Sequence, residues 1–124
     1  MSVGTILYVE DNDDNVYMLK NRLERAGYEV HVAVDGLEGV SKARELVPDL
    51  IIMDLILPEL DGWEATRQIR ADTATRDVPI IALSSSAMPA DRQRALDVGC
   101  DRFDAKPVDF NRLKTIIEEL LAGR

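Results

Sequence analysis

The sequence predicts an α/β domain, a parallel β-sheet with helices on both of its faces. Short apolar runs alternate with segments of helical spacing, strand then helix, five times along the chain. No repeat, linker or low-complexity tract interrupts this order. Such alternation favours parallel strands that are joined by helices packed on the two sides of the sheet. With 124 residues, the chain is long enough for one domain with a core of its own.

The first strand is predicted at residues 6–9, which are apolar and run directly into the acidic segment 10–15. The Asn and Asp side chains of that segment suit the start of a helix, because they cap free backbone N–H groups and favour the positive end of the helix dipole. Gly27 is expected to end this helix, whose apolar positions are Val16, Leu19, Leu23 and Ala26.

The second strand is predicted at residues 28–34, where the alternation of apolar and polar residues indicates a strand nearer to the sheet edge. His31, the only histidine, lies in this alternation and is expected to face solvent rather than bind a metal. Asp35 and Gly36 form a turn, and the helix that follows is expected to end before Pro48. Its apolar positions are Leu37, Val40, Ala43 and Leu46.

The third strand is predicted at residues 50–55, a run rich in Ile and Leu that is typical of a strand buried on both faces. Asp54 interrupts its apolar character. Because a carboxylate cannot remain in an apolar interior without a partner, Asp54 is expected where the strand opens into its loop. A third helix follows at residues 62–71, and Trp63 is expected to pack in the core rather than stack on a ligand.

The fourth strand is predicted at residues 78–83 and leads into the hydroxyls of residues 84–86. The helix at residues 89–98 has only Ala95 and Leu96 as clearly apolar members, so we expect it to be the least firmly anchored element. A short strand around residues 102–105 and a last amphipathic helix complete the pattern. The apolar residues of that helix are Phe110, Leu113, Ile116, Ile117, Leu120 and Leu121.

Composition limits the function classes. The formal net charge of -8 argues against a general nucleic-acid or anionic-membrane surface, because such a surface needs a basic patch, and it leaves cations and proteins as expected partners. The single cysteine, Cys100, excludes an internal disulfide and is expected to be a small buried residue. Residues 1–4 do not resemble a signal peptide, and no apolar run reaches the roughly eighteen residues of a membrane span, so a cytoplasmic protein is expected.

Polar and charged residues gather at the carboxyl ends of the predicted strands, the edge at which open parallel sheets hold their functional sites. These residues are Glu10, Asp11, Asp54, Ser84 and Lys106. Two carboxylates about 4 Å apart repel each other by roughly 4 kcal/mol at an effective dielectric constant of about 20. The cluster therefore calls for a cation, and a few carboxylate oxygens with room for water suit Mg²⁺ better than zinc.

A metal beside an aspartate, with a lysine and a hydroxyl opposite, is a setting for phosphoryl transfer. Asp54 would be the nucleophile and would form an acyl phosphate. Mg²⁺ and Lys106 would neutralise the charge on the phosphoryl oxygens during transfer, and the Ser84 hydroxyl would donate to one of them afterwards.

Four motifs together make the chain similar to a known family: V-E-D-N at residues 9–12, I-I-M-D-L-I-L-P-E-L-D-G at 51–62, I-A-L-S at 81–84 and A-K-P at 105–107. The chain resembles a response-regulator receiver domain, which implies one domain over residues 1–124 with a core of about residues 5–121. The resemblance implies a flavodoxin-like, doubly wound (βα)5 fold with five parallel strands in the order 2-1-3-4-5. It also implies that Asp54 accepts phosphate from a histidine kinase or a histidine phosphotransfer protein.

The resemblance implies a role for each site residue. Asp11 and Asp54 resemble the direct Mg²⁺ ligands, and Glu10 resembles an acidic neighbour that acts through water. The backbone carbonyl of Ile56 corresponds to the third protein ligand. The first acidic position is Glu where many relatives have Asp, a variation that should preserve metal binding. Lys106 resembles the phosphate-binding lysine.

The remaining family positions concern switching and phosphate lifetime. Ser84 resembles the switch hydroxyl and Phe103 the rotating aromatic, for which plain core packing is the alternative. Lys106-Pro107 resembles the cis peptide of the family. Ile56 and Ser86 stand at positions that tune how long the phosphate lasts. Because Ile56 has no side-chain group to orient an attacking water, we predict slow self-dephosphorylation, over minutes or longer.

Only residues 122–124 follow the last predicted helix, so we expect signalling through protein contact rather than through an attached output domain. The expected contact face comprises the fourth helix, the fifth strand and the fifth helix, where phosphorylation would draw Ser84 inward, let Phe103 follow and shift a two-state equilibrium. The sequence is similar both to stand-alone receivers of the cell-division or chemotaxis type and to receivers attached to hybrid kinases. A monomer or a weak dimer is expected.

Other functions fit the sequence less well. A flavodoxin or a Rossmann dehydrogenase would need a phosphate-binding loop after the first strand, where this chain has acidic residues and no G-x-G-x-x-G motif. A haloacid-dehalogenase type phosphatase also uses an Asp nucleophile, but it would want a second acid at the position of Ile56. A binding module that keeps the fold and is never phosphorylated is a further alternative.

Overall fold

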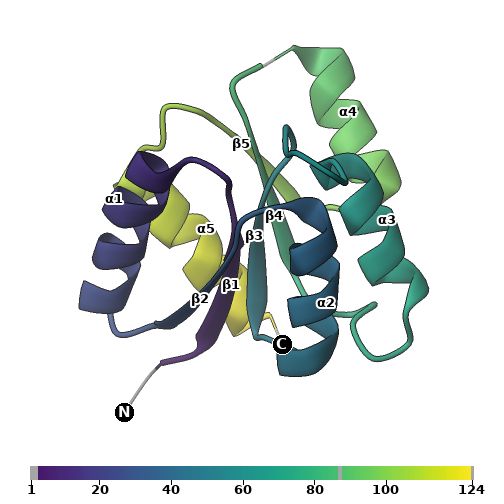
Figure 1. The fold of residues 1–124 in the computed structure, drawn as a ribbon. Helices are drawn as coiled ribbons and strands as arrows, with labels where there is room; N and C mark the ends of the chain where they lie inside the picture. Colours follow the sequence, from purple (N-terminus) through teal and green to yellow (C-terminus); the bar gives the residue numbers. More distant parts are fainter. Residues whose placement is uncertain (1–2, 87, 124) are drawn as a thin grey trace.

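A computed structural model describes residues 3–86 and 88–123. Its strands form one parallel sheet in the order β2-β1-β3-β4-β5, which confirms the predicted strand order (Figure 1). Met1, Ser2, Ala87 and Arg124, which the prediction of one domain includes, lie outside the described residues. The strands are β1 (Thr5–Val9), β2 (Glu29–Ala33), β3 (Leu50–Asp54), β4 (Ile80–Ser84) and β5 (Arg102–Ala105).

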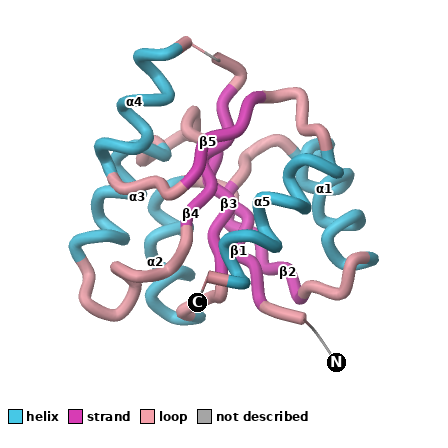
Figure 2. Tube along the Cα trace, turned by 180° about the vertical axis from the view of Figure 1, so that it is seen from behind, coloured by secondary structure: helices cyan, strands magenta, loops and turns pink. Residues whose placement is uncertain are grey.

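Helices connect successive strands and cover both faces of the sheet, as the alternating sequence predicts. One face carries α1 and α5, and the other carries α2, α3 and α4 (Figure 1). Seen from behind, α5 crosses in front of the sheet with α1 beside it (Figure 2). The helices are α1 (Asp13–Arg25), α2 (Gly36–Leu46), α3 (Gly62–Ala71), α4 (Pro89–Val98) and α5 (Phe110–Ala122).

Short polar side chains begin four of the helices. Asn12 Oδ1 accepts a hydrogen bond from the backbone N–H of Asn15 at 2.9 Å, which caps α1. Asp35, Asp61 and Asp109 cap α2, α3 and α5 in the same way. Each cap satisfies a backbone donor that the helix itself leaves free, so these loop residues fix where the helices start.

Helix α4 has fewer buried residues than the other helices. Met88 stands at its N-cap and makes no side-chain cap hydrogen bond. Ala95 is the only buried residue of α4. The helix thus buries little apolar surface, which agrees with the expectation that it is the least firmly anchored element.

The core consists of two apolar layers, one on each face of the sheet. Successive strand residues point to opposite faces, so Leu7 and Val9 pack toward α2 and α3 while Ile6 and Tyr8 pack toward α1 and α5. All residues of β3 and β4 are buried, as expected for central strands of a parallel sheet. The two central strands are therefore enclosed between the helix layers, and this packing sets the positions of the carboxyl ends of β3 and β4.

The fourth strand begins later than predicted. Val78 belongs to a turn, since its backbone N–H donates to the Thr75 carbonyl at 3.1 Å, and Pro79 has no N–H to give to a strand ladder. The strand therefore starts at Ile80 and extends through Ser84, which pairs with Ala105 of β5.

Several expectations about single residues are confirmed. Trp63 and Cys100 are buried in the same apolar layer, and burial raises the pKa of the Cys100 thiol to about 11. His31 lies near the surface, with its Nε2 3.0 Å from a carboxylate oxygen of Glu29. Within residues 3–86 and 88–123, no helix is long and apolar enough to cross a membrane.

Candidate functional site

The predicted site residues meet at the carboxyl edge of the sheet, which is the upper edge in Figure 1. Val9 of β1 pairs with Met53 of β3, so the next residues, Glu10 after β1 and Asp54 at the end of β3, lie side by side. Asp54 in turn pairs with Leu83 of β4, next to Ser84. Parallel pairing of these strands therefore brings segments far apart in sequence to one place.

Three carboxylates form the centre of the site. Glu10, Asp11 and Asp54 each offer one oxygen, and these oxygens all lie within 4.8 Å of one another. Glu10 and Asp54 are buried, with 1% and 4% of their surface exposed, whereas Asp11 is exposed. A site of this kind, with hard oxygen ligands open to solvent on one side, fits a magnesium ion that keeps some of its waters.

Lys106 supplies a cation to this cluster. Its Nζ donates to Asp54 Oδ2 at 2.7 Å and to Glu10 Oε1 at 3.0 Å. Burial and the neighbouring Asp54 carboxylate raise the pKa of Glu10, an effect that Lys106 only partly opposes. Burial alone would lower the pKa of Lys106, but its hydrogen bonds to Asp54 and Glu10 outweigh burial and raise it. Lys106 is therefore a charged counterion held between two buried acids.

The residue two positions after Asp54 also contacts it. The backbone N–H of Ile56 donates to Asp54 Oδ1 at 3.1 Å, so both Asp54 oxygens accept a hydrogen bond. The Ile56 side chain points outward and is 67% exposed. Lys106-Pro107 is a cis peptide, as predicted.

Ser84 lies at the end of β4 and is 4% exposed. Its Oγ accepts a hydrogen bond from the backbone N–H of Ser86 at 3.0 Å. The Ser86 hydroxyl in turn donates to Asp91 in the first turn of α4. A short chain of hydrogen bonds thus connects the predicted switch hydroxyl to the start of the most weakly anchored helix.

Phe103 lies on β5 and is 8% exposed, within the apolar layer that also contains Trp63. The Arg92 guanidinium of α4 lies over its ring, 5.8 Å from the guanidinium carbon to the ring centroid. The ring therefore packs in the core and contacts α4 at the same time.

Two sets of contacts were not predicted from the sequence. Glu10 also accepts hydrogen bonds from the Tyr8 hydroxyl and the Asn15 amide, each 3.3 Å from Oε1. The Tyr8 contact could have been predicted from the sequence, because a tyrosine two positions before an acid in an otherwise aliphatic run lies on the same face as that acid. Asp104 is buried on β5 and pairs with Arg112 of α5, whose Nε lies 2.9 Å from Oδ1. Nothing in the local pattern pairs those two residues.

Similar sequences place the chain in a family. The family profile described as "Response regulator receiver domain" matches residues 6–118. The polar-differentiation response regulator DivK of Brucella anthropi is 37% identical over 117 residues, which cover 94% of this chain and 95% of that protein.

Solved structures agree with the sequence match. The receiver domain of the sensor histidine kinase PA1611 from Pseudomonas aeruginosa, a crystal structure with a magnesium ion coordinated in its active site cleft, is 39% identical with a TM-score of 0.90 and covers 96% of this chain and 98% of that one. The chemotaxis protein CheY4 of Vibrio cholerae is 28% identical with a TM-score of 0.90 and covers 96% and 99%. The chain thus belongs to the response-regulator receiver domains, the signalling phosphoprotein domains of two-component systems.

Proposed function

We propose that Asp54 accepts a phosphoryl group from the phosphohistidine of a histidine kinase or a histidine phosphotransfer protein, in a Mg²⁺-dependent reaction that the domain itself catalyses. A bond forms between an Asp54 oxygen and phosphorus, the phosphorus–nitrogen bond of the donor breaks, and the electron pair returns to the imidazole. The carrying observation is the position of Lys106, whose ammonium lies 2.7 Å from Asp54 Oδ2 within a cluster of three acids.

The residues around Asp54 have separate tasks in this reaction. Because the Nζ of Lys106 already contacts Asp54, it can move its contact from the Asp54 carboxylate to the negatively charged phosphoryl oxygens during transfer. The Ser84 hydroxyl gives up its contact with the Ser86 N–H and donates to the phosphoryl group after transfer. The burial of Asp54 and Ser84 limits the access of water to the acyl phosphate.

The metal would be held by Asp11 and Asp54 directly, by Glu10 through water and by the backbone carbonyl of Ile56. When bound, Mg²⁺ supplies positive charge for the phosphoryl oxygens. The donor set of three carboxylates within 4.8 Å supports this assignment.

Receiver domains interact with kinases and with downstream targets. For this chain we propose that the target binds across α4, β5 and α5. A groove of about 1090 Å³ lies between α4 and α5, and its walls include Leu96, Phe103, Asp104, Arg112 and Ile116. Phe103 and α4 form part of this surface, so a change at Ser84 can alter it through Ser86 and Asp91.

A cytoplasmic location and a single receiver domain over residues 1–124 belong to the same proposal.

The intact mass of the protein after incubation with acetyl phosphate and Mg²⁺ tests this function. The parent should gain one phosphoryl group, whereas Asp54→Asn and an EDTA-treated parent should gain none. Asp97→Asn, which changes an exposed acid of α4, is the matched control and should be labelled like the parent. Labelling of Asp54→Asn at the parental rate would contradict the assignment of Asp54. If the parent gains phosphate from neither acetyl phosphate nor a phosphorylated histidine donor, the chain is a binding module instead.

A further inference from the structure

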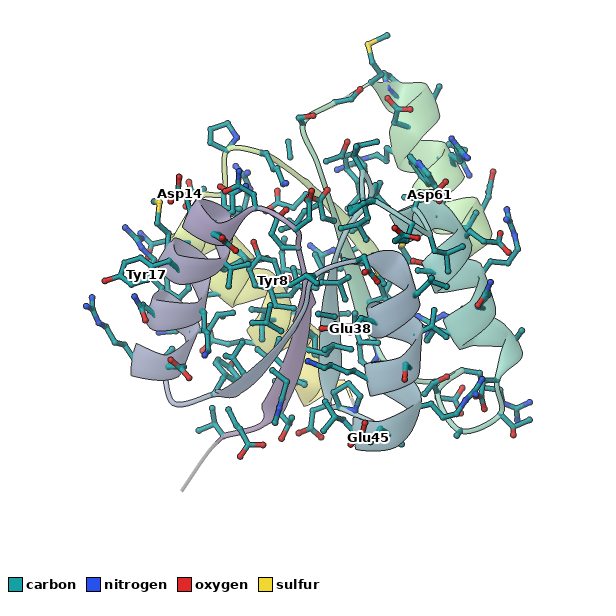
Figure 3. All side chains as sticks on the ribbon, viewed as in Figure 1. Tyr8, Asp14, Tyr17, Glu38, Glu45 and Asp61 are labelled. Carbon is teal, nitrogen blue, oxygen red and sulfur yellow. The ribbon has the colours of Figure 1, made fainter. Side chains whose placement is uncertain are left out.

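Tyr8 places a hydroxyl inside an apolar strand. Among the described residues it is the bulkiest of the fully buried side chains, with 1% of its surface exposed, and its neighbours Ile6, Leu7 and Val9 on β1 are aliphatic. Figure 3 shows it within the molecule beside α1, whereas Tyr17 points away from the outer side of that helix. A buried phenol normally has a hydrogen-bond partner, and its partner here is Glu10.

The Tyr8 hydroxyl points toward the acid cluster and contacts Glu10. Glu10 directly follows β1, and its backbone N–H continues the pairing with β2 by donating to the Ala33 carbonyl at 2.9 Å, so the extended chain places Glu10 on the same side as Tyr8. The Tyr8 hydroxyl donates to Glu10 Oε1 at 3.3 Å. This distance is long for a hydroxyl donor.

The other donors to Glu10 are held less firmly. Asn15 reaches Oε1 from α1 and is exposed, and Lys106 reaches it from the loop after β5 with 21% of its side chain exposed. The Asn12 backbone N–H lies 3.4 Å from the second oxygen, Oε2. Among these donors within the described residues, the Tyr8 hydroxyl is the one that belongs to a fully buried side chain, on the strand that leads directly into Glu10.

Lys106 is also shared. It contacts both Glu10 and Asp54, and in the proposed reaction it moves with the phosphoryl charge on Asp54. Glu10 Oε1 then keeps only Tyr8 and Asn15 of its present side-chain donors. Tyr8 can therefore hold Glu10 in place both before and after transfer.

We propose that Tyr8 is a positioning residue for the divalent-cation site: its hydroxyl fixes Oε1 of Glu10 against β1 and leaves the other carboxylate oxygen available to the site that Glu10 forms with Asp11 and Asp54. The inference rests on the proposed Mg²⁺ site. Hydrogen bonds that orient metal-binding carboxylates typically change metal affinity by about ten- to a hundredfold when they are removed. If the Tyr8–Glu10 hydrogen bond only satisfied the buried hydroxyl, its removal would leave the Mg²⁺ affinity unchanged.

Isothermal titration of the metal-free protein with MgCl₂ tests this inference, with the thermal unfolding midpoint in EDTA measured alongside. Tyr8→Phe removes the hydroxyl and keeps the ring, and its Mg²⁺ affinity should fall about tenfold. Tyr28→Phe is the matched control, because Tyr28 is 8% exposed and lies in the same apolar layer as Tyr8. It should bind Mg²⁺ like the parent. In a Lys106→Met background the effect of Tyr8→Phe should be larger, since Asn15 is then the remaining side-chain donor to Oε1.

Equal Mg²⁺ affinity of Tyr8→Phe and the parent would overturn the inference while leaving the proposed function intact. The same holds if Tyr28→Phe loses as much affinity as Tyr8→Phe, because the change would then report on the core in general. A Tyr8→Phe chain that does not fold in EDTA would also overturn it, since the hydroxyl would be a structural group. Failure of the parent to bind Mg²⁺ would instead overturn the metal site of the proposed function and the inference with it.

Discussion

The ammonium of Lys106 lies between Asp54 and Glu10, 2.7 Å from one carboxylate and 3.0 Å from the other. The two acids come from different strands, and Lys106 follows a third. One cation therefore compensates two buried charges and joins the ends of β1, β3 and β5. Removing it leaves those charges without their internal counterion.

We expect Lys106→Met to destabilise the metal-free protein by about 3 kcal/mol, because an acid pair that loses its buried partner is left uncompensated. Excess Mg²⁺ should restore part of this stability by binding the same acids. Urea unfolding in EDTA and in Mg²⁺ measures both effects. Lys114→Met on α5, outside the site, should change stability by no more than about 0.5 kcal/mol. Equal stability of Lys106→Met and the parent in EDTA would contradict this account.

Glu10 should make the metal-free protein less stable as the pH rises. Burial and then Asp54 raise the pKa of Glu10 above its ordinary 4.5, so the folded state holds this proton more tightly than the unfolded state. The resulting stabilisation is complete below the ordinary pKa and is lost as the pH rises through the raised one. Relative to Glu10→Gln, the parent should lose stability in EDTA as the pH rises above 4.5, the ordinary pKa of the carboxyl group. The urea midpoints of the two proteins across this pH range measure their difference in stability. If the parent instead gained stability relative to Glu10→Gln as the pH rises, the predicted direction would be wrong.

Gly62 should be intolerant of any side chain. A Cβ at this position would lie 2.2 Å from the Asp54 carbonyl oxygen and 2.6 Å from the Leu55 Cα, and these backbone atoms cannot swing aside. Gly62→Ala is expected to cost about 1–3 kcal/mol and to slow phosphorylation, because it displaces the backbone of Asp54. Gly123→Ala is the control, since its nearest contacts are at 3.7 Å. Chemical unfolding and the rate of labelling by acetyl phosphate would show both effects, and a Gly62→Ala protein as stable as the control would refute the clash.

Asp104 and Arg112 should contribute unequally to stability. Asp104 is 6% exposed, and its Oδ2 has no hydrogen-bond partner among the described residues. Removing Arg112 leaves this carboxylate without its cation, so Arg112→Met should cost about 1–3 kcal/mol. Asp104→Leu removes the buried charge itself and should be neutral or stabilising. Thermal unfolding of the two variants decides the matter; a larger loss for Asp104→Leu than for Arg112→Met would show that the pair is a net stabilising bridge.

The phosphoprotein should lose its phosphate slowly. The exposed Ile56 side chain has no group that could orient a water toward Asp54. Ile56→Asn, which adds such a group, is expected to shorten the lifetime several-fold, whereas Leu37→Asn at a similarly exposed position of α2 should not. The decay of mass label after removal of excess acetyl phosphate gives the rates. Equal phosphate lifetimes for Ile56→Asn and the parent would show that Ile56 does not determine the lifetime.

The order of the elements and the location of the site follow from the sequence because both depend on local patterns. Apolar runs define the strands, and parallel strands carry Glu10, Asp54 and Lys106 to one edge whatever the details of packing. The start of β4 could be placed only approximately, since Val78 is apolar but bonds within a turn.

Contacts between distant side chains could not be predicted in this way. The pairing of Asp104 with Arg112 depends on how α5 lies against β5, and the contact of Ser86 with Asp91 depends on the path of the loop before α4. The Tyr8 hydroxyl is an intermediate case. Its direction follows from strand period, but its contact with Glu10 requires that the chain after β1 turns the carboxylate back toward the strand.

Ala95 is the one buried residue of α4, Arg92 and Arg94 lie over the rings of Phe103 and Trp63, and the remaining positions of the helix are exposed or half-buried. Its outward residues can therefore be exchanged with little effect on folding, while its first turn stays linked to Ser84 through Ser86 and Asp91. If the target binds across α4, β5 and α5 as proposed, the exposed positions of α4 are the place where protein engineering can change binding specificity without replacing a residue of the acid cluster.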